Sequence, residues 1–318
     1  MKKLLLIALL GSVYATILHV PDDYDTIQEG IDAAVDSDTV LVDQGTYNEN
    51  LIIDKTITLT SNAIYDDLSE WVLNAGEYYI NNDNILNTRI DGSNDTNGDN
   101  FQSTILINSP DDECISPIIF GFTIQGGSGT VVLVEDSRDG ERVEVEKNLG
   151  GGFLSLGALP SFNYNQIINN KRDAGDSEPP IEGGGGGDVG NGDQFELRSF
   201  PNPDYDFSST RFDCNGDIDL SYNLWSDNDA DYGNTLATTH FEGNLDMSNS
   251  VFDVYNCPDQ EVTTVWVDVD EGVNVNFENG VGELCSITED VWVSPNGDDN
   301  NFGTSEVQAF KTIKRALE

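Results

Sequence analysis

The sequence has few basic residues and very many acidic ones. Its 318 residues include 14 Lys and Arg against 58 Asp and Glu, which gives a formal net charge of −44. A surface this negative repels nucleic-acid phosphates and anionic lipid headgroups, so the composition argues against nucleic-acid binding and against membrane binding through basic patches. Cations and neutral glycans remain as partners that the charge permits.

Histidine is scarce, and the cysteines lack the short spacings of metal ligands. The chain has only His19 and His240, and it contains no Cys-x-x-Cys pair. Zinc sites are built from such closely spaced ligands, so a zinc site has little support. The cysteines instead suit disulfides formed in an oxidising compartment.

Four cysteines allow three disulfide pairings, and their spacing alone does not choose among them. They are Cys114, Cys214, Cys257 and Cys285. The interval between Cys257 and Cys285 suits two adjacent repeats of a repeating fold, so a bridge between them is predicted. Buried free thiols are the alternative.

Long hydrophobic runs are absent, and the one short run lies at the N-terminus. Lys2 and Lys3 precede the apolar stretch Leu4–Leu10, and Val13–Ala15 supplies small residues at the cleavage positions. This is the pattern of an export signal over 1–15, and the stretch is too short to span a bilayer. We therefore expect a secreted or cell-surface protein with no transmembrane segment, whose mature chain begins near Thr16. A buried first element is the alternative.

Short β-rich runs alternate with polar turns along most of the chain. Three of them, Ile218–Ser221, Leu245–Ser248 and Val273–Asn276, share one alternation of apolar and polar residues and recur at nearly equal intervals. A period in the twenties, with strands and no regular helices, indicates a β-solenoid. A β-sandwich would also explain short strands, but it predicts hairpins at regular spacing.

The stretch Asn163–Asn170 shows the expected repeat unit. Ile167 and Ile168 supply an apolar pair for the core, and asparagines stand on either side of it. Asparagine and glycine tolerate the left-handed backbone conformation that tight corners require. The sequence therefore predicts asparagines at the corners of the coils.

Insertions are expected to project from the solenoid near 62–88, 130–148 and 171–193. The second is predicted as a β-hairpin, because two alternating runs flank Asp139–Gly140. The first contains Trp71 and Tyr78 and is expected to include a short helix over Asp67–Leu73. Its aromatic rings could stack on sugars, but packing against the solenoid is the favoured interpretation.

Residues 16–36 are predicted to form an N-terminal cap. Ile27, Ile31 and Ala34 share one helical face, and Thr26 or Asp25 can cap the helix. Such a helix would cover the open end of a solenoid and protect its unpaired edge.

Three stretches resemble a known family: Val20–Ser61, Pro117–Gly126 and Gly150–Asn170. They are similar to right-handed parallel β-helix proteins of the pectin-lyase-like superfamily, which includes pectinesterases. The resemblance implies an all-β fold, a right-handed parallel β-helix over 37–287 with a capping helix and a hairpin insertion. The superfamily contains lyases, hydrolases, esterases and adhesins, so fold does not fix activity.

The C-terminal residues 288–318 carry a separate resemblance. Val291–Thr304 and Phe310–Leu317 are similar to a short domain of unknown function that opens many bacterial β-helix proteins. Thr312–Ile313 also repeats the Thr26–Ile27 start of the first cap. We predict that a second β-helix module begins here and is truncated.

Catalytic motifs of this superfamily are not matched. Pectinesterase-like catalysis needs two carboxylates and an arginine on one face, and the nearest acidic cluster, Asp227–Asp231, is interpreted as a solvated turn because nothing apolar frames it. His240 lacks the flanking glycines of a polygalacturonase loop. A uronate lyase needs a strong base, and Lys171–Arg172 is the only adjacent basic pair between Pro21 and Cys285.

The preferred functional hypothesis is a non-catalytic exported module that binds a polysaccharide or a cell-surface glycan. The alternative is a carbohydrate-active enzyme, namely a pectinesterase, a polysaccharide lyase or a glycoside hydrolase, with a divergent or missing active site. Retention on a polysaccharide without release of products would distinguish the first from the second.

Calcium has better candidates than zinc. Carboxylate and amide side chains concentrate in polar turns at 91–99, 213–217 and 296–300, and such oxygens suit a hard cation, although none of the turns has EF-hand spacing. Ordinary corner turns are the alternative explanation. The candidate ligands are Asp95, Asn97, Asp99, Asp213, Asn215 and Asp217.

Overall fold

The fold is seen in a computed structural model of the chain. It describes residues 15–94, 101–110, 113–138, 141–171, 185–190, 195–197, 214, 216–230, 233–239, 241–255, 265–266, 273–284, 292–298, 307 and 309–313.

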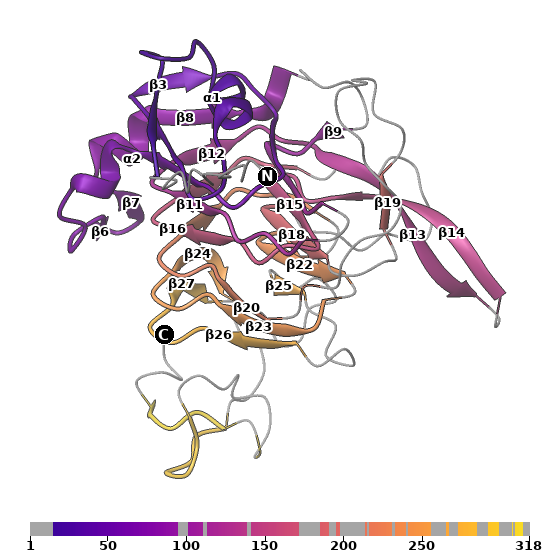
Figure 1. The fold of residues 1–318 in the computed structure, drawn as a ribbon. Helices are drawn as coiled ribbons and strands as arrows, with labels where there is room; N and C mark the ends of the chain where they lie inside the picture. Colours follow the sequence, from indigo (N-terminus) through magenta and orange to yellow (C-terminus); the bar gives the residue numbers. More distant parts are fainter. Residues whose placement is uncertain are drawn as a thin grey trace, which may run out of the picture.

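The protein is all-β, and most of its strands lie in three long parallel sheets (Figure 1). In spatial order, sheet A consists of β1 (Ile17–Val20), β2 (Thr39–Val42), β5 (Thr58–Ser61), β11 (Ile118–Phe120), β16 (Ser161–Asn163), β20 (Gly216–Asp219), β23 (Gly243–Asp246) and β26 (Asn274–Asn276). Sheet B consists of β3 (Gly45–Tyr47), β8 (Thr88–Asp91), β12 (Thr123–Gln125), β17 (Gln166–Ile168), β21 (Leu224–Ser226), β24 (Val251–Tyr255) and β27 (Val281–Leu284). Sheet C consists of β4 (Leu51–Ile53), β10 (Ile105–Asn108), β15 (Phe153–Leu156), β18 (Gly187–Gly190), β22 (Leu236–Thr239) and β25 (Val265–Trp266).

From β2 onward the chain visits the three sheets in a fixed order, A then B then C. We call each such circuit a coil; β16, β17 and β18 form one coil, and β20, β21 and β22 form the next. Each strand pairs in parallel with the corresponding strands of the neighbouring coils. The repeat seen in the sequence is therefore a repeat of strands along three parallel sheets.

The register agrees with the predicted repeat at one step and differs at the next. Ile218 pairs with Leu245, as predicted. Leu245 pairs with Val275 rather than with the predicted Val273, so the repeat at this step is longer than expected. Because side chains alternate between the faces of a strand, moving from Val273 to Val275 keeps the same face inward, and apolar alternation alone could not fix this register.

The inward side chains of the three sheets meet in one hydrophobic core. Phe153 of sheet C stacks on Phe162 of sheet A with ring centroids 4.2 Å apart, and its centroid lies 6.3 Å from that of Trp225 in sheet B. All three side chains are fully buried. Burying a large apolar side chain stabilises a fold by about 1.5–3 kcal/mol, so this core is the main source of stability.

Asparagines stand at the corners, which confirms the prediction from the 163–170 pattern. Asn165 is fully buried between sheets A and B, and its side-chain amide donates to the carbonyl of Ile119 (3.0 Å) and to Oδ1 of Asn223 (3.2 Å) in the next coil. Asn170 occupies the equivalent place between sheets B and C. Backbone groups that the strands leave unpaired at each corner are satisfied in this way.

Helix α1 (Ile27–Ala33) covers the end of the core at β1. Thr26 and Glu29 exchange side-chain to backbone hydrogen bonds, which is a capping box. Ile27 and Ile31 are buried and join the core. The predicted cap at 16–36 thus contains the first strand of sheet A as well as the helix.

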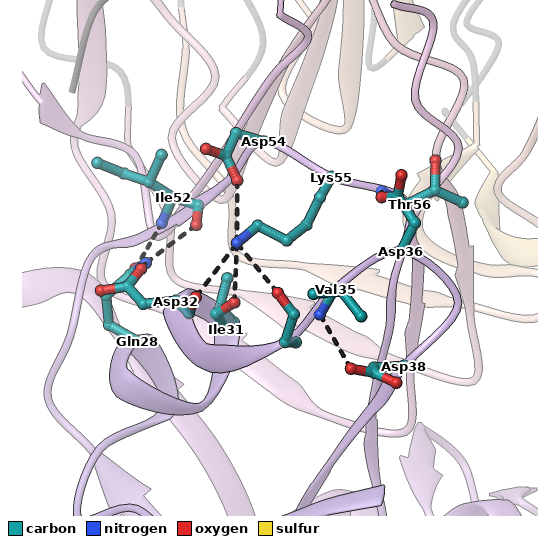
Figure 2. Close-up of polar contacts among 11 residues, drawn as sticks. Gln28, Ile31, Asp32, Val35, Asp36, Asp38, Ile52, Asp54, Lys55 and Thr56 are labelled. Carbon is teal, nitrogen blue, oxygen red and sulfur yellow. Dashed lines mark hydrogen bonds and ion pairs between the residues drawn. The ribbon is translucent and has the colours of Figure 1, made fainter. Parts of the chain in front are cut away.

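Gln28 occupies the free edge of β4, the end strand of sheet C. Its Oε1 accepts from the backbone N–H of Ile52 (2.8 Å), and its Nε2 donates to the Ile52 carbonyl (3.1 Å; Figure 2). One amide side chain therefore supplies the acceptor and the donor that a neighbouring strand would otherwise provide.

Lys55 satisfies the carbonyl end of α1. Its ammonium donates to the carbonyls of Ile31 (3.2 Å), Asp32 (3.5 Å) and Ala34 (3.3 Å), and it lies 3.6 Å from the Asp54 carboxylate (Figure 2). A cation at this end of a helix also interacts favourably with the helix dipole.

Replacing Lys55 with methionine is therefore expected to lower the free energy of unfolding by about 1–2 kcal/mol, because three carbonyls lose a charged donor while the apolar stem is kept. Urea denaturation measures the change. Asp54→Asn is the matched control: the Asp54 side chain is 45% exposed, and exposed ion pairs contribute about 0–1 kcal/mol. Equal losses in the two variants would contradict a capping role for Lys55.

Two insertions pack against the outer sides of the sheets. The first holds η1 (Asn62–Tyr65), the antiparallel pair β6 (Val72–Asn74) and β7 (Tyr78–Ile80), and helix α2 (Asp83–Asn87), with η2 (Gly92–Asn94) just after β8. The second is a hairpin of β13 (Gly129–Arg138) and β14 (Glu141–Leu149), which projects from the sheets in Figure 1 and also pairs with β9 (Phe101–Gln102) and β19 (Phe195–Leu197). The turn of this hairpin lies outside the described residues.

The helix expected over Asp67–Leu73 is wrong, because the segment leads into a β-hairpin. Val72 and Leu73 pair with Ile80 and Tyr79. Gly76 supplies the turn with a φ of 108°, and its N–H is bound by the Asn74 side chain (2.9 Å). A turn built on Gly76 favours strand pairing over a helix here.

The insertion expected at 171–193 also needs correction, because β18 lies inside that range. The glycines at the start of β18 and just before it allow neighbouring atoms to pack closely against the backbone. A Cβ on Gly186 would lie 2.4 Å from the carbonyl oxygen of Thr235, and one on Gly187 would lie 2.3 Å from the Phe153 ring. The sequence placed this segment in a projecting insertion, whereas Gly187–Gly190 is a paired strand of sheet C.

The C-terminal segment is described in part. Val293 and Phe310 form an isolated parallel bridge, and a helical residue follows at Ile313. The second module over 288–318 stays a prediction. Within the described part of the chain, no helix is both long and apolar enough to cross a membrane.

Candidate binding surface

The hairpin β13–β14 and β9 cover the outer face of β4, β10 and β15 in sheet C. Apolar residues of these strands and of sheet C form one buried cluster, with every member at most 3% exposed. Its members are Ile52, Phe101, Leu106, Val132, Leu149, Leu154 and Leu156. This face is therefore closed to large ligands.

The first insertion covers part of the outer face of sheet B. Trp71, Ile80 and Ile85 pack in one cluster with Leu224 of β21. Trp71 is only 6% exposed, and it meets Tyr164 edge-on at a centroid distance of 5.5 Å. The prediction that the aromatic rings of this insertion pack against the sheets rather than face sugars is therefore confirmed for Trp71 and wrong for Tyr78, which is 37% exposed.

Sheet A differs, because its outward side chains in the later coils are polar. We call this surface the polar face. It is formed by the outward residues of β16, β20, β23 and β26, which are intermediate in exposure or fully exposed: Ser161, Asn163, Asp217, Asp219, Asn244, Asp246, Asn274 and Asn276. These strands lie one below another in Figure 1.

Side chains on the polar face form columns that run from coil to coil. Asn244 Nδ2 donates to Asp217 Oδ1 (2.6 Å), and Asn274 Nδ2 donates to Asn244 Oδ1 (3.3 Å). In the second column, Asn276 Nδ2 donates to Asp246 Oδ1 (3.0 Å). Adjacent strands lie about 4.8 Å apart, so the face repeats carboxylate and amide groups at that interval.

A repeated turn fixes the orientation of the second column. Asp219 Oδ1 accepts from the N–H (3.0 Å) and the hydroxyl (2.6 Å) of Ser221, and Asp246 Oδ1 accepts from the N–H of Ser248 (3.0 Å). In the same way, Asn276 Oδ1 accepts from the N–H of Glu278 (3.0 Å). These groups are therefore held in place before any ligand arrives, which lowers the entropy cost of binding.

The charges of the polar face are all negative. Asp219 and Asp246 are register partners on adjacent strands, and like charges placed directly opposite each other destabilise a sheet. Within the described residues neither takes part in an ion pair, since the only such pair joins Lys55 and Asp54. The arrangement therefore costs stability, and it favours ligands rich in hydroxyl donors or in positive charge.

Of the predicted calcium ligands, only Asp217 is described, and it lies on the polar face. Asp95, Asn97, Asp99, Asp213 and Asn215 lie outside the described residues, as does the predicted Cys257–Cys285 bridge. Among the residues that are described, no three His, Cys, Asp or Glu side chains are grouped so that they could hold a metal ion.

Away from the polar face, Asp91 and Asp38 are partly or largely buried carboxylates with displaced pKa values. Burial raises the pKa of Asp91, but hydrogen bonds from Ser93 and Gln125 outweigh it and leave that pKa below its usual value. Backbone hydrogen bonds from Val35 and Thr16 lower the pKa of Asp38. Both groups thus favour the ionised form rather than the raised pKa of a general acid.

The cluster Asp227–Asp231 is a corner of the coil, which confirms its interpretation as a turn. Asp227 has a φ of 54°, and its N–H donates to Asp253 (2.8 Å). Asn228 is buried and bonded to the carbonyl of Ile167 (2.9 Å). Asp231 itself lies outside the described residues.

A disulfide joins Cys114 to Cys214, with an S–S distance of 2.06 Å. Sequence reasoning missed this pair, because the two residues are 100 positions apart. With this bridge in place, a second disulfide could join only Cys257 and Cys285, and that bridge stays a prediction.

A comparison with protein-family models finds no match to this chain, and a comparison with curated proteins finds none either.

Proposed function

We propose that the protein is an exported, non-catalytic right-handed parallel β-helix of the pectin-lyase-like kind, and that its polar face binds a polysaccharide or a cell-surface glycan. The three parallel sheets and the fixed order in which the chain visits them support the fold. The resemblance of Val20–Ser61 supports the family.

One observation carries the binding proposal. Apolar insertions cover part of sheet C and part of sheet B, whereas sheet A presents pre-oriented carboxylate and amide columns to solvent. Sugars offer hydroxyl groups that can donate to such oxygens and accept from such amides. The negative charge favours neutral glycans over polyuronates, which the field of the protein repels.

Retention on immobilised neutral polysaccharides, pectin and alginate tests the proposal. Asp219→Ala and Asn244→Ala are expected to weaken retention on a neutral glycan about 10-fold each, because one hydrogen bond contributes about 0.5–1.5 kcal/mol. Glu77→Ala, on the exposed β6–β7 turn, is the matched control and should leave retention unchanged.

Two outcomes contradict the proposal. Retention that survives both substitutions would place binding elsewhere on the molecule. Release of methanol or of unsaturated or free sugars by the purified chain would instead favour the carbohydrate-active enzyme.

A further inference from the structure

Asp38 is a buried carboxylate that forms no ion pair within the described parts of the chain, where the one such pair joins Lys55 and Asp54. It lies just before β2 and is 4% exposed. Figure 2 shows the Lys55 ammonium directed at the carbonyls that end α1, while Asp38 is bonded to Val35. A buried charge of this kind is costly unless it is compensated.

Two backbone N–H groups bind the carboxylate. Val35 N donates to Oδ2 (2.9 Å), and Thr16 N donates to Oδ1 (2.7 Å). These bonds from Val35 and Thr16 hold the pKa of Asp38 below its usual value, so the group is charged at neutral pH. One of its backbone donors is thus the nitrogen of the residue expected to open the mature chain.

Thr16 is fixed at this position by the sheet as well. Its carbonyl accepts from the N–H of Thr39 (2.8 Å), and β1 begins at the next residue. Ala15 and Thr16 are both exposed. The peptide bond between them follows the small-residue pattern Val13–Ala15 of the export signal.

We propose that the mature chain begins at Thr16 and that its α-ammonium group forms an ion pair with the buried carboxylate of Asp38. The proposal rests on the export part of the proposed function and is independent of glycan binding. A protease of the signal-peptidase class adds water across the Ala15–Thr16 bond, leaving a carboxylate on Ala15 and an amine on Thr16. The amine takes up a proton, because α-amino groups have a pKa of about 7.7–8.0.

The new charge appears on an atom that already contacts the carboxylate. Cleavage therefore converts a neutral N–H donor to the Asp38 carboxylate into a charged donor at the same place, which adds the attraction between opposite charges to an existing hydrogen bond. The ion pair also gives the Asp38 carboxylate a partner of opposite charge. Processing thus makes the folded protein more stable, and a chain extended beyond Thr16 lacks that gain.

The test compares three forms of the chain from Thr16 onward: one with a free α-amine, one N-α-acetylated, and one extended by Ala15. Acetylation keeps an N–H at the same atom and removes only the charge. The free form is expected to melt about 2–4 °C above both others. In Asp38→Asn, this difference should disappear.

Asp36→Asn is the matched control, since the Asp36 carboxylate binds the N–H of Thr56 and not that of Thr16. This variant should keep the difference in melting temperature between the free and acetylated forms. Mass spectrometry of protein exported from a signal-bearing gene should give a chain that begins at Thr16.

Equal melting of the free and acetylated forms, or a difference that persists in Asp38→Asn, would overturn the ion pair. A mature chain that begins at another residue would overturn it too. Loss of glycan retention alone would remove the binding function and leave this result untouched.

Discussion

Replacing Asn170 with leucine is expected to lower the free energy of unfolding by about 3–5 kcal/mol. Asn170 is fully buried, and its Oδ1 accepts from the N–H of Gly127 (3.1 Å) and the hydroxyl of Thr104 (3.3 Å). Its Nδ2 donates to the carbonyl of Ile124 and to Oδ1 of Asn228, both at 3.1 Å. Leucine has a similar volume and removes the partner of the Gly127 N–H and the side-chain donor to the Ile124 carbonyl, at about 1–3 kcal/mol each. The Thr104 hydroxyl and Asn228 Oδ1 keep their other hydrogen bonds, to the Gln125 carbonyl and from the backbone N–H of residue 170.

Urea denaturation of Asn170→Leu measures the loss. The control is Asn169→Gly at the neighbouring position, where the side chain is exposed and φ is 54°. Glycine adopts that conformation freely, so this change should stay within about 0.5 kcal/mol. A loss below about 1 kcal/mol in the leucine variant would show that the asparagine corners are not needed for stability.

Removing the Cys114–Cys214 disulfide is expected to lower the free energy of unfolding by about 2–5 kcal/mol. The bridge closes a loop between residues 100 positions apart, and in the chain-entropy model a loop of this length contributes about 4.7 kcal/mol. The double variant Cys114→Ala, Cys214→Ala, compared with the unreduced protein, measures the effect by urea denaturation.

Two controls accompany this measurement. Ser116→Ala changes an exposed neighbour of Cys114 and should leave the midpoint unchanged. Peptide mapping under non-reducing conditions should find Cys114 linked to Cys214. An unchanged unfolding free energy in the double variant, with the bridge mapped in the parent protein, would show that the bridge does not stabilise the fold.

The features predicted correctly are those that local sequence encodes. Asparagines could be expected at corners because asparagine tolerates the left-handed conformation, which Asn169 adopts with a φ of 54°. Asn165 and Asn170 instead stabilise the corners by binding backbone groups, which the sequence did not indicate. The strands of the hairpin β13–β14 could be assigned from alternation around Asp139–Gly140. The Asp67–Leu73 helix failed because the turn at Gly76 determines how the residues before it pair. The Cys114–Cys214 bridge depends on which coils lie close together, which spacing does not encode.

The polar face could not be recognised from sequence. Outward residues such as Asp219 and Asn244 have the polar character of any exposed strand position. They stand out only because parts of sheets B and C are covered, and that follows from where the insertions fold back. Sequence reasoning therefore found the strands that carry the face but not the face itself.

The amide of Gln28 has a consequence for self-association. Strand edges left open at the end of a sheet can recruit strands of other molecules and so begin aggregation. At β4 the backbone N–H and carbonyl of Ile52 are already bound by Gln28. An incoming strand would have to displace that side chain and shift α1, so end-to-end polymerisation through β4 is disfavoured.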